Sequence, residues 1–296
     1  MISAAVTLAY FWTTSEIQQS TYIPNKTYKL TILNTNEFNL DTTSDYKVIN
    51  QGLNHRQELI KKIRREVSAE GGKLLLLSGG ELSTDDDILN LKQLNQLGYN
   101  AMTVSPLLFD EPINTIRLQE AAADFPFLSA NLYESETGRP VFDAYALFDF
   151  DGLRIAVMGI TGQGSFSDGI SEYRRGIELM DPVLATSELI PYLRRQADIV
   201  IVATHAIHYP KPEKTDTKTS LPISNLEGID LLVGNSTLAP NSKIQGSESS
   251  AALNTTPLYP SIRRIDLEFR NGELKKTNSI QINMITKMEP KENINF

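Results

Sequence analysis

Short, unbroken apolar runs constrain the fold of this chain more than any other feature of its sequence. KLLLLSGG at 73–80, DIVIVATH at 198–205 and GIDLLVGNS at 228–236 are such runs, and each ends in small or polar residues. A run of this length between turn signals is typical of a strand buried on both faces. The stretch 56–72, directly before the first of these runs, has its apolar residues at helical spacing. Its apolar face consists of Leu59, Ile60, Ile63 and Val67. The alternation predicts an α/β fold in which helices cover the sheets.

Two β-hairpins are predicted in the second half of the chain. The stretch 145–160 turns at Asp151 and Gly152, and the stretch 262–282 turns at Asn271 and Gly272. Asp-Gly and Asn-Gly pairs between such strands are the strongest local signal for a tight hairpin turn.

Two long polar stretches, 208–225 and 235–260, each follow a buried strand. We expect them to be loops, and loops of this length are more often functional or disordered than structural.

Composition excludes several functions. The chain has 296 residues, a formal charge of −8 and no cysteine. Nucleic-acid binders carry basic stripes and this chain has none, so we expect no nucleic-acid partner. Without cysteine, zinc–thiolate sites and thiol chemistry are excluded.

The N-terminal residues from Ile2 to Trp12 are mostly apolar. This length suits the remnant of an export signal or a buried first strand, and it is too short to span a membrane. No later segment is long and apolar enough to be transmembrane. We therefore expect an N-terminal segment at 1–25, one domain at 26–285 and a C-terminal tail at 286–296.

Chemistry in open α/β sheets collects at the carboxyl ends of the strands. Most of the expected strand ends carry small or polar clusters, and the pattern predicts a site spread over many loops. The clusters are 34–39, 78–81, 105–110, 203–205 and 234–238.

The motifs around these clusters resemble the metallophosphatase domain of the periplasmic 5'-nucleotidase and UDP-sugar hydrolase family, which has the calcineurin-like phosphoesterase fold. The resemblance covers 26–284 and rests on LLLLSGG, GYNAMTV, FPFLSANLYESETGRPVFDAYALFD, GLRIAVMGIT, IVATHAIHY and DLEFRNGEL. It implies a four-layer αββα sandwich in a periplasmic or extracellular protein. The family's further nucleoside-binding domain would lie beyond Phe296, so we do not expect nucleotide binding.

The departures from the family fall on its metal ligands and its catalytic His. At those positions the chain has Glu37, Asn39, Glu81, Pro106, Leu107, Ser236 and Leu238. Two matching residues remain: Asp110, which corresponds to the Asp that orients the catalytic His, and His205, which corresponds to a metal ligand. We expect Asp110 to be a turn or capping residue. We also expect Leu107, Leu108 and Phe109 to fill the emptied pocket by apolar packing.

The histidine count supports the same conclusion without the family. A two-metal site needs several His and carboxylate ligands around ions about 4 Å apart. The chain has only three histidines: His55 in a helical stretch, and His205 and His208 close together. Losing a general acid–base alone costs about 10²–10⁴-fold in rate. We therefore expect no catalytic residues, no metal and no other cofactor.

The sequence thus predicts a catalytically degenerate domain that binds or regulates a protein partner in the cell envelope. An alternative is a residual or altered phosphoester or nucleotide hydrolase that uses a single divalent cation. Its ligands would be Glu37, Asn39, Glu81 and His205.

Overall fold

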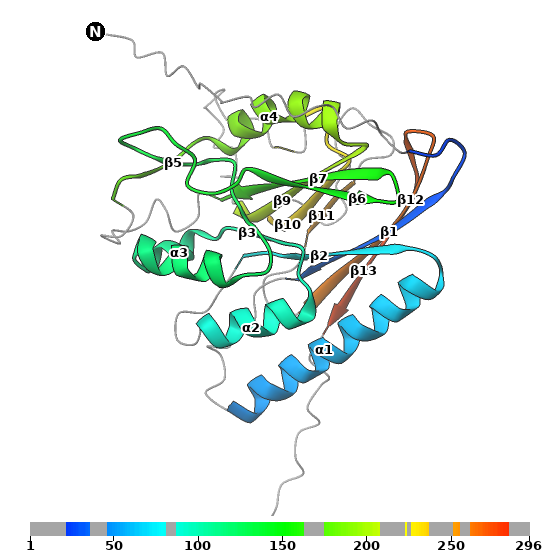
Figure 1. The fold of residues 1–296 in the computed structure, drawn as a ribbon, viewed down its shortest axis with the longest axis horizontal. Coiled ribbons are helices and arrows are strands. Elements are labelled where there is room, and N and C mark those ends of the chain that lie inside the picture. Colours follow the sequence, from blue (N-terminus) through cyan, green and yellow to red (C-terminus); the bar gives the residue numbers. More distant parts are fainter. Residues whose placement is uncertain are drawn as a thin grey trace, which may run out of the picture.

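In the computed structural model, the described residues are 22–35, 46–80, 87–162, 175–207, 223, 226–236, 251–254 and 261–283. They form four layers, helix–sheet–sheet–helix (Figure 1). The predicted αββα sandwich is confirmed.

The first sheet has six strands in the order β13-β12-β1-β2-β3-β4. Strands β1 to β4 run parallel, and β12 is antiparallel to both β1 and β13. The bounds are β1 Tyr28–Thr35, β2 Lys73–Ser78, β3 Ala101–Thr103, β4 Phe127–Leu128, β12 Ser261–Arg270 and β13 Glu273–Asn283.

The second sheet has five strands in the order β11-β10-β9-β7-β6, and all but β6 are parallel. Their bounds are β6 Tyr145–Phe150, β7 Leu153–Thr161, β9 Ile199–Ile207, β10 Leu231–Ser236 and β11 Ala251–Asn254. A small sheet pairs β5, Leu132–Glu134, with β8, Ile177–Leu179. Strand β11 lies inside the polar stretch 235–260, so the prediction of a continuous loop there is wrong.

Both predicted hairpins are confirmed, as β6–β7 and β12–β13. Asp151 and Gly152 have φ of 57° and 96°, and Asn271 and Gly272 have φ of 55° and 78°. Positive φ at both central residues is the requirement of a type I′ turn, which matches the twist of the flanking strands.

Helices cover the two outer faces (Figure 1). The first sheet is covered by α1 Tyr46–Ala69, α2 Asp87–Leu97 and α3 Ile113–Ala122, and the second by α4 Pro182–Gln196. The helical face predicted in α1 is confirmed, because Ile60, Ile63 and Val67 are buried in the core beneath it and Leu59 packs against that core.

Three apolar cores separate the layers. One lies between the first sheet and α1–α3, one between the two sheets, and one between the second sheet and α4. Alternate residues of each central strand face alternate cores. In β1, for example, Leu30 and Ile32 face the core between the sheets, and Leu33 faces the helices.

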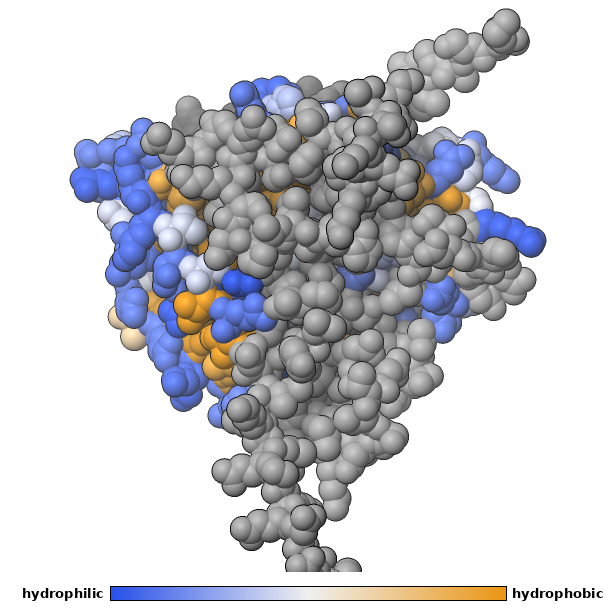
Figure 2. All heavy atoms as spheres, turned by 180° about the vertical axis from the view of Figure 1, so that it is seen from behind, coloured by the Kyte–Doolittle hydropathy of each residue, from blue (hydrophilic) through white to orange (hydrophobic). Residues whose placement is uncertain are grey.

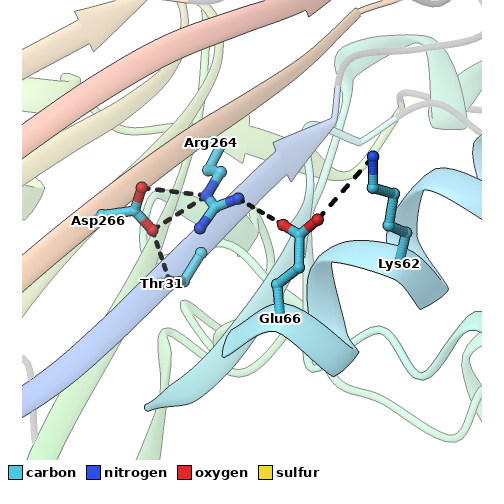
Figure 3. Close-up of polar contacts among 5 residues, drawn as sticks. All are labelled: Thr31, Lys62, Glu66, Arg264 and Asp266. Atoms are coloured by element: carbon cyan, nitrogen blue, oxygen red, sulfur yellow. Dashed lines mark hydrogen bonds and ion pairs between the residues drawn. The ribbon is translucent and has the colours of Figure 1, made fainter. Parts of the chain in front are cut away.

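A polar network holds α1 against the first sheet (Figure 3). Arg264 of β12 lies within 3.0 Å of the Asp266 carboxylate and within 3.1 Å of the Glu66 carboxylate on α1. Thr31 of β1 donates to Asp266 at 2.7 Å, and Lys62 lies 3.9 Å from Glu66. The Arg264 side chain is only 18% exposed, so its ion pairs with the two carboxylates stabilise the fold more than they would at a fully solvated site.

The two sheets also meet directly. Gly159 of β7 accepts a hydrogen bond from the Ala130 backbone N–H at 2.8 Å. A Cβ atom at Gly159 would lie 2.2 Å from the Leu128 carbonyl oxygen. The strands come this close only because glycine lacks a side chain.

The surface is mixed. Seen from behind, apolar areas are bordered by hydrophilic residues (Figure 2). The large exposed apolar side chains of the described residues are spread over several elements: Ile23, Ile113, Leu118, Leu147, Leu184 and Ile280. None of the described helices has both the length and the hydropathy needed to cross a membrane.

Candidate functional site

The carboxyl ends of strands from both sheets come together between the sheets. His205, near the end of β9, reaches across to the residues that follow β2 and β3. Thr161, the last residue of β7, reaches Val104 next to β3. Residues of three of the polar strand-end clusters, 78–81, 105–110 and 203–205, therefore lie in one region.

His205 is fixed at both ring nitrogens. Its Nδ1 lies 2.6 Å from the Gly79 carbonyl oxygen, and its Nε2 lies 3.2 Å from Ser105 Oγ. Because a carbonyl can only accept, Nδ1 carries the proton and donates it. In the neutral ring, Nε2 then accepts from the Ser105 hydroxyl. His205 is only 4% exposed, so these two bonds join the second sheet to the first inside the protein.

A second cross-sheet network consists of neutral groups. Thr161 Oγ1 donates to the Val104 carbonyl oxygen at 2.9 Å and lies 2.8 Å from Ser129 Oγ. The Asn131 side chain accepts from the Thr161 backbone N–H at 2.9 Å and donates to the Thr161 carbonyl oxygen at 2.8 Å. All three side chains are fully buried. These bonds satisfy the buried polar atoms without a charge.

A buried cation lies at the end of β1, on the helix side of the sheet. Arg56 of α1 donates to Thr35 Oγ1 at 3.1 Å and also to the Tyr99 hydroxyl. Burial lowers the pKa of Arg56 to about 10, because desolvation disfavours the charged form.

Four residues of the predicted site can be placed in part. Pro106 is buried and begins η2, Pro106–Asp110, and the side chain of Leu107 is outside the described residues. Asp110 is the exposed last residue of η2. The N-cap of α3 is Pro112, so Asp110 does not cap that helix; it ends a short 3-10 helix. Ser236 ends β10, and its side chain is not described.

Glu37, Asn39, Glu81 and Leu238 lie outside the described residues.

Leu108 and Phe109 pack against apolar neighbours. Both belong to the core between the first sheet and the helices, where Phe109 contacts Phe142 edge-on at 6.1 Å between ring centroids. That Leu107, Leu108 and Phe109 fill an emptied pocket stays a prediction, since the side chain of Leu107 is not described. Leu108 and Phe109 are ordinary residues of this core.

A two-metal centre does not fit the donors at the described strand ends. Pro106 has no side-chain donor at a ligand position, and His205 is bonded to protein through both nitrogens. The other buried polar side chains that contact one another there, Ser129, Asn131 and Thr161, are hydroxyls and an amide. Among the residues that the structure describes, no group of three or more His, Cys, Asp or Glu is placed to hold a metal.

His205→Ala should destabilise the domain by about 3 kcal/mol, because it removes the buried hydrogen bonds of His205 to Gly79 and Ser105. Urea unfolding followed by circular dichroism measures the loss. His55→Ala is the control, since His55 is exposed on α1 and its change should stay within about 0.5 kcal/mol. Equal unfolding midpoints for the two variants would contradict the structural role of His205.

Solved structures with the same fold define the class of protein. The calcineurin-like phosphoesterase YfkN of Bacillus subtilis superposes with a TM-score of 0.64 at 18% identity, over 88% of this chain and 92% of that one. A 5'-nucleotidase precursor of Thermus thermophilus gives 0.66 at 18% identity, over 87% and 55%. The chain has the calcineurin-like phosphoesterase fold.

Sequence relatives narrow the class to a family. Protein UshA of Yersinia enterocolitica is 34% identical over 304 residues, covering 90% of this chain and 54% of UshA. The 5'-nucleotidase of Vibrio cholerae is 33% identical over 305 residues, with the same coverage. The chain belongs to the UshA/5'-nucleotidase family, and it spans about half the length of these relatives. No protein-family model matches the chain.

Two buried arginines near the site were not singled out from the sequence: Arg56 and Arg263. A signal for Arg263 exists. It is adjacent to Arg264 in the strand SIRRIDLEF, and side chains alternate between the faces of a strand. Of two neighbouring arginines in this strand, one therefore points toward the helices and the other toward the space between the sheets.

Proposed function

We propose that this chain is a catalytically degenerate member of the UshA/5'-nucleotidase family that acts as a binding or regulatory module in the periplasm or at the cell surface. The observation that supports this most directly is His205. It is the one histidine at the described strand ends, and it joins the sheets through Gly79 and Ser105. A side chain used in this way is not available as a metal ligand without breaking a buried bond.

The sequence supports the proposal independently. Only three histidines occur in the whole chain, and Leu107 and Leu238 stand where the family has histidines. Single changes around a metal ligand cost roughly 10–100-fold in affinity or activity. Several ligands and the catalytic His are replaced together here, so efficient phosphoester hydrolysis is not expected.

The alternative function is hydrolysis with a single cation at Glu37, Asn39, Glu81 and His205. One observation favours it. A metal-binding histidine usually donates its other ring N–H to a carbonyl or carboxylate, and His205 Nδ1 does so to Gly79. Rotation of the Ser105 hydroxyl would free Nε2 for a cation. The names of the relatives, which include 5'-nucleotidases, are compatible with this alternative.

Metal content and turnover distinguish the two functions. The chain is purified with Mg²⁺, Mn²⁺ and Zn²⁺ and measured by elemental analysis, then assayed on a chromogenic phosphoester and on UDP-glucose. The 5'-nucleotidase of Vibrio cholerae serves as the active control. We expect substoichiometric metal and turnover at least about 10³-fold below that control. One metal per chain with metal-dependent turnover would refute the degenerate function.

The expected partner is a protein of the cell envelope. The polar stretches 208–225 and 235–260 follow strands at the site and are candidate contact regions. A pull-down from envelope extract, repeated with 208–222 or 237–250 deleted so that β10 and β11 are kept, tests this part of the proposal. A partner retained equally by both deletion variants would show that neither stretch is the contact.

A further inference from the structure

The segment that precedes β1 lies against the turn between β12 and β13 (Figure 1). The Asn25 backbone N–H donates to Asn271 Oδ1 at 2.8 Å, and Asn271 Nδ2 donates to Asn25 Oδ1 at 3.1 Å. The Asn271 backbone N–H also donates to the Tyr22 hydroxyl. These three hydrogen bonds, which we call the amide clasp, hold both the side chain and the backbone of Asn271 although its partners are distant in the sequence.

Aromatic packing supports the amide clasp from below. The Tyr22 ring stacks on Tyr28 of β1 at 5.2 Å between ring centroids and contacts Phe269 of β12 edge-on at 6.4 Å. Tyr28 and Phe269 are buried in the core between the sheets, whereas Asn25 and Asn271 are exposed. The amide clasp is therefore a surface contact that is attached to the core through one aromatic ring.

Asn271 is followed by Gly272, and this is the only Asn-Gly pair in the sequence. Asparagine is thermolabile because its side-chain amide can be lost, and the reaction is easiest before glycine, which has no Cβ to hinder it. The Gly272 nitrogen attacks Asn271 Cγ and forms a C–N bond, while the bond from Cγ to the side-chain nitrogen breaks. Ammonia leaves with the proton of the Gly272 N–H, and water then opens the cyclic imide to Asp or isoaspartate. The net reaction consumes one water, releases one ammonia and changes no oxidation state.

We propose that Asn271 is a deamidation site whose reaction rate is set by the amide clasp, and that the reaction opens the clasp. The Asn271 side chain can turn its Cγ toward Gly272 only after both of its bonds to Asn25 break. In the product Asp, the carboxylate has no donor for Asn25 Oδ1, so two acceptors face each other. The site lies at the amino end of β1, about 23 Å from Thr35 at the carboxyl end, so the inference does not depend on the proposed function.

Mass spectrometry of the full chain aged at mildly alkaline pH tests the rate. Deamidation is detected as the mass gained when NH₂ is replaced by OH in the peptide that contains Asn271. The test variant combines Tyr22→Phe, which removes the hydroxyl, with Asn25→Gly, which removes the side-chain acceptor and tolerates the φ of 65°. We expect Asn271 of this variant to react at least about fivefold faster than in the native chain, because two of its hydrogen bonds are lost.

Asn278 is the internal control for this measurement. It lies on β13 of the same hairpin and is followed by Ser279, and its rate should differ less than about twofold between the two chains. Equal rates at Asn271 in the native chain and the variant, or an intact Asn271 in the aged variant, would overturn the proposal.

Asn271→Asp tests the consequence without ageing. Asp-Gly fits the same turn, as Asp151 and Gly152 show in the other hairpin, so the hairpin is kept. We expect trypsin to cleave after Lys26 at least about fivefold faster in this variant, because the clasp no longer holds the segment. Cleavage after Lys62, which is exposed on α1, is the control and should not change. Unchanged cleavage after Lys26, or equal acceleration at both sites, would contradict a local opening of the clasp.

Discussion

Gly159→Ala is expected to destabilise the domain by about 3 kcal/mol or more, a large part of the roughly 5–15 kcal/mol that holds a domain folded. The added methyl group would lie 2.2 Å from the Leu128 carbonyl oxygen and 2.5 Å from its carbonyl carbon. Both atoms belong to the backbone, so a change of side-chain rotamer cannot relieve the contact. One sheet must move away from the other, which also strains the hydrogen bond from Ala130 to Gly159.

Gly138→Ala is the control for this prediction. Gly138 has a φ of 65° and nothing within 4 Å of an added Cβ, so only the backbone strain of a positive φ applies, about 1 kcal/mol. Denaturant unfolding of both variants measures the difference. If Gly159→Ala unfolds at the same midpoint as Gly138→Ala, the two sheets do not approach as closely as described.

Restoring the family's ligands should give the chain the ability to bind two divalent ions, with micromolar affinity or better, which corresponds to about 8 kcal/mol or more per ion. The physical reason is that the αββα frame is intact and His205 already lies at the strand ends. Titration with Zn²⁺ or Mn²⁺ counts the ions. The substitutions are Glu37→Asp, Asn39→His, Glu81→Asp, Pro106→Asn, Leu107→His, Ser236→His and Leu238→His.

Adding His205→Ala to the restored variant should reduce the count or the affinity, because one ligand is lost again. A restored variant that is folded but binds no metal would show that the strand ends no longer hold the geometry of a dinuclear centre. That result would also argue that the local geometry of the strand ends had changed together with the ligand residues.

The structure explains why apolar residues close in sequence to the candidate site are retained. Leu108 and Phe109 come two and three residues after Pro106, and both are buried in the core beneath the helices. Truncating a buried Phe costs about 3–5 kcal/mol. These residues are needed for folding whether or not a metal binds nearby.

Much of the fold could be predicted from local patterns. The apolar runs identify the strands, the spacing of Ile60, Ile63 and Val67 identifies a helix face, and the Asp-Gly and Asn-Gly pairs identify both hairpins. These patterns work because burial and turn geometry act on neighbouring residues. The same reasoning failed at β11, a strand of four residues inside a polar stretch. Its pairing with β10 is decided by the sheet and not by its own composition.

The sequence by itself determined which chemical groups the chain has: no cysteine, three histidines, and Pro106, Leu107 and Leu238 where the resemblance leads one to expect Asn and His. Only the tertiary structure decided how the remaining groups are used. His205 meets Ser105 across 100 residues and Gly79 across 126, and Arg263 meets Asn34 through the pairing of β12 with β1. Contacts of this kind depend on how distant strands align and how two sheets pack. No local periodicity encodes that alignment.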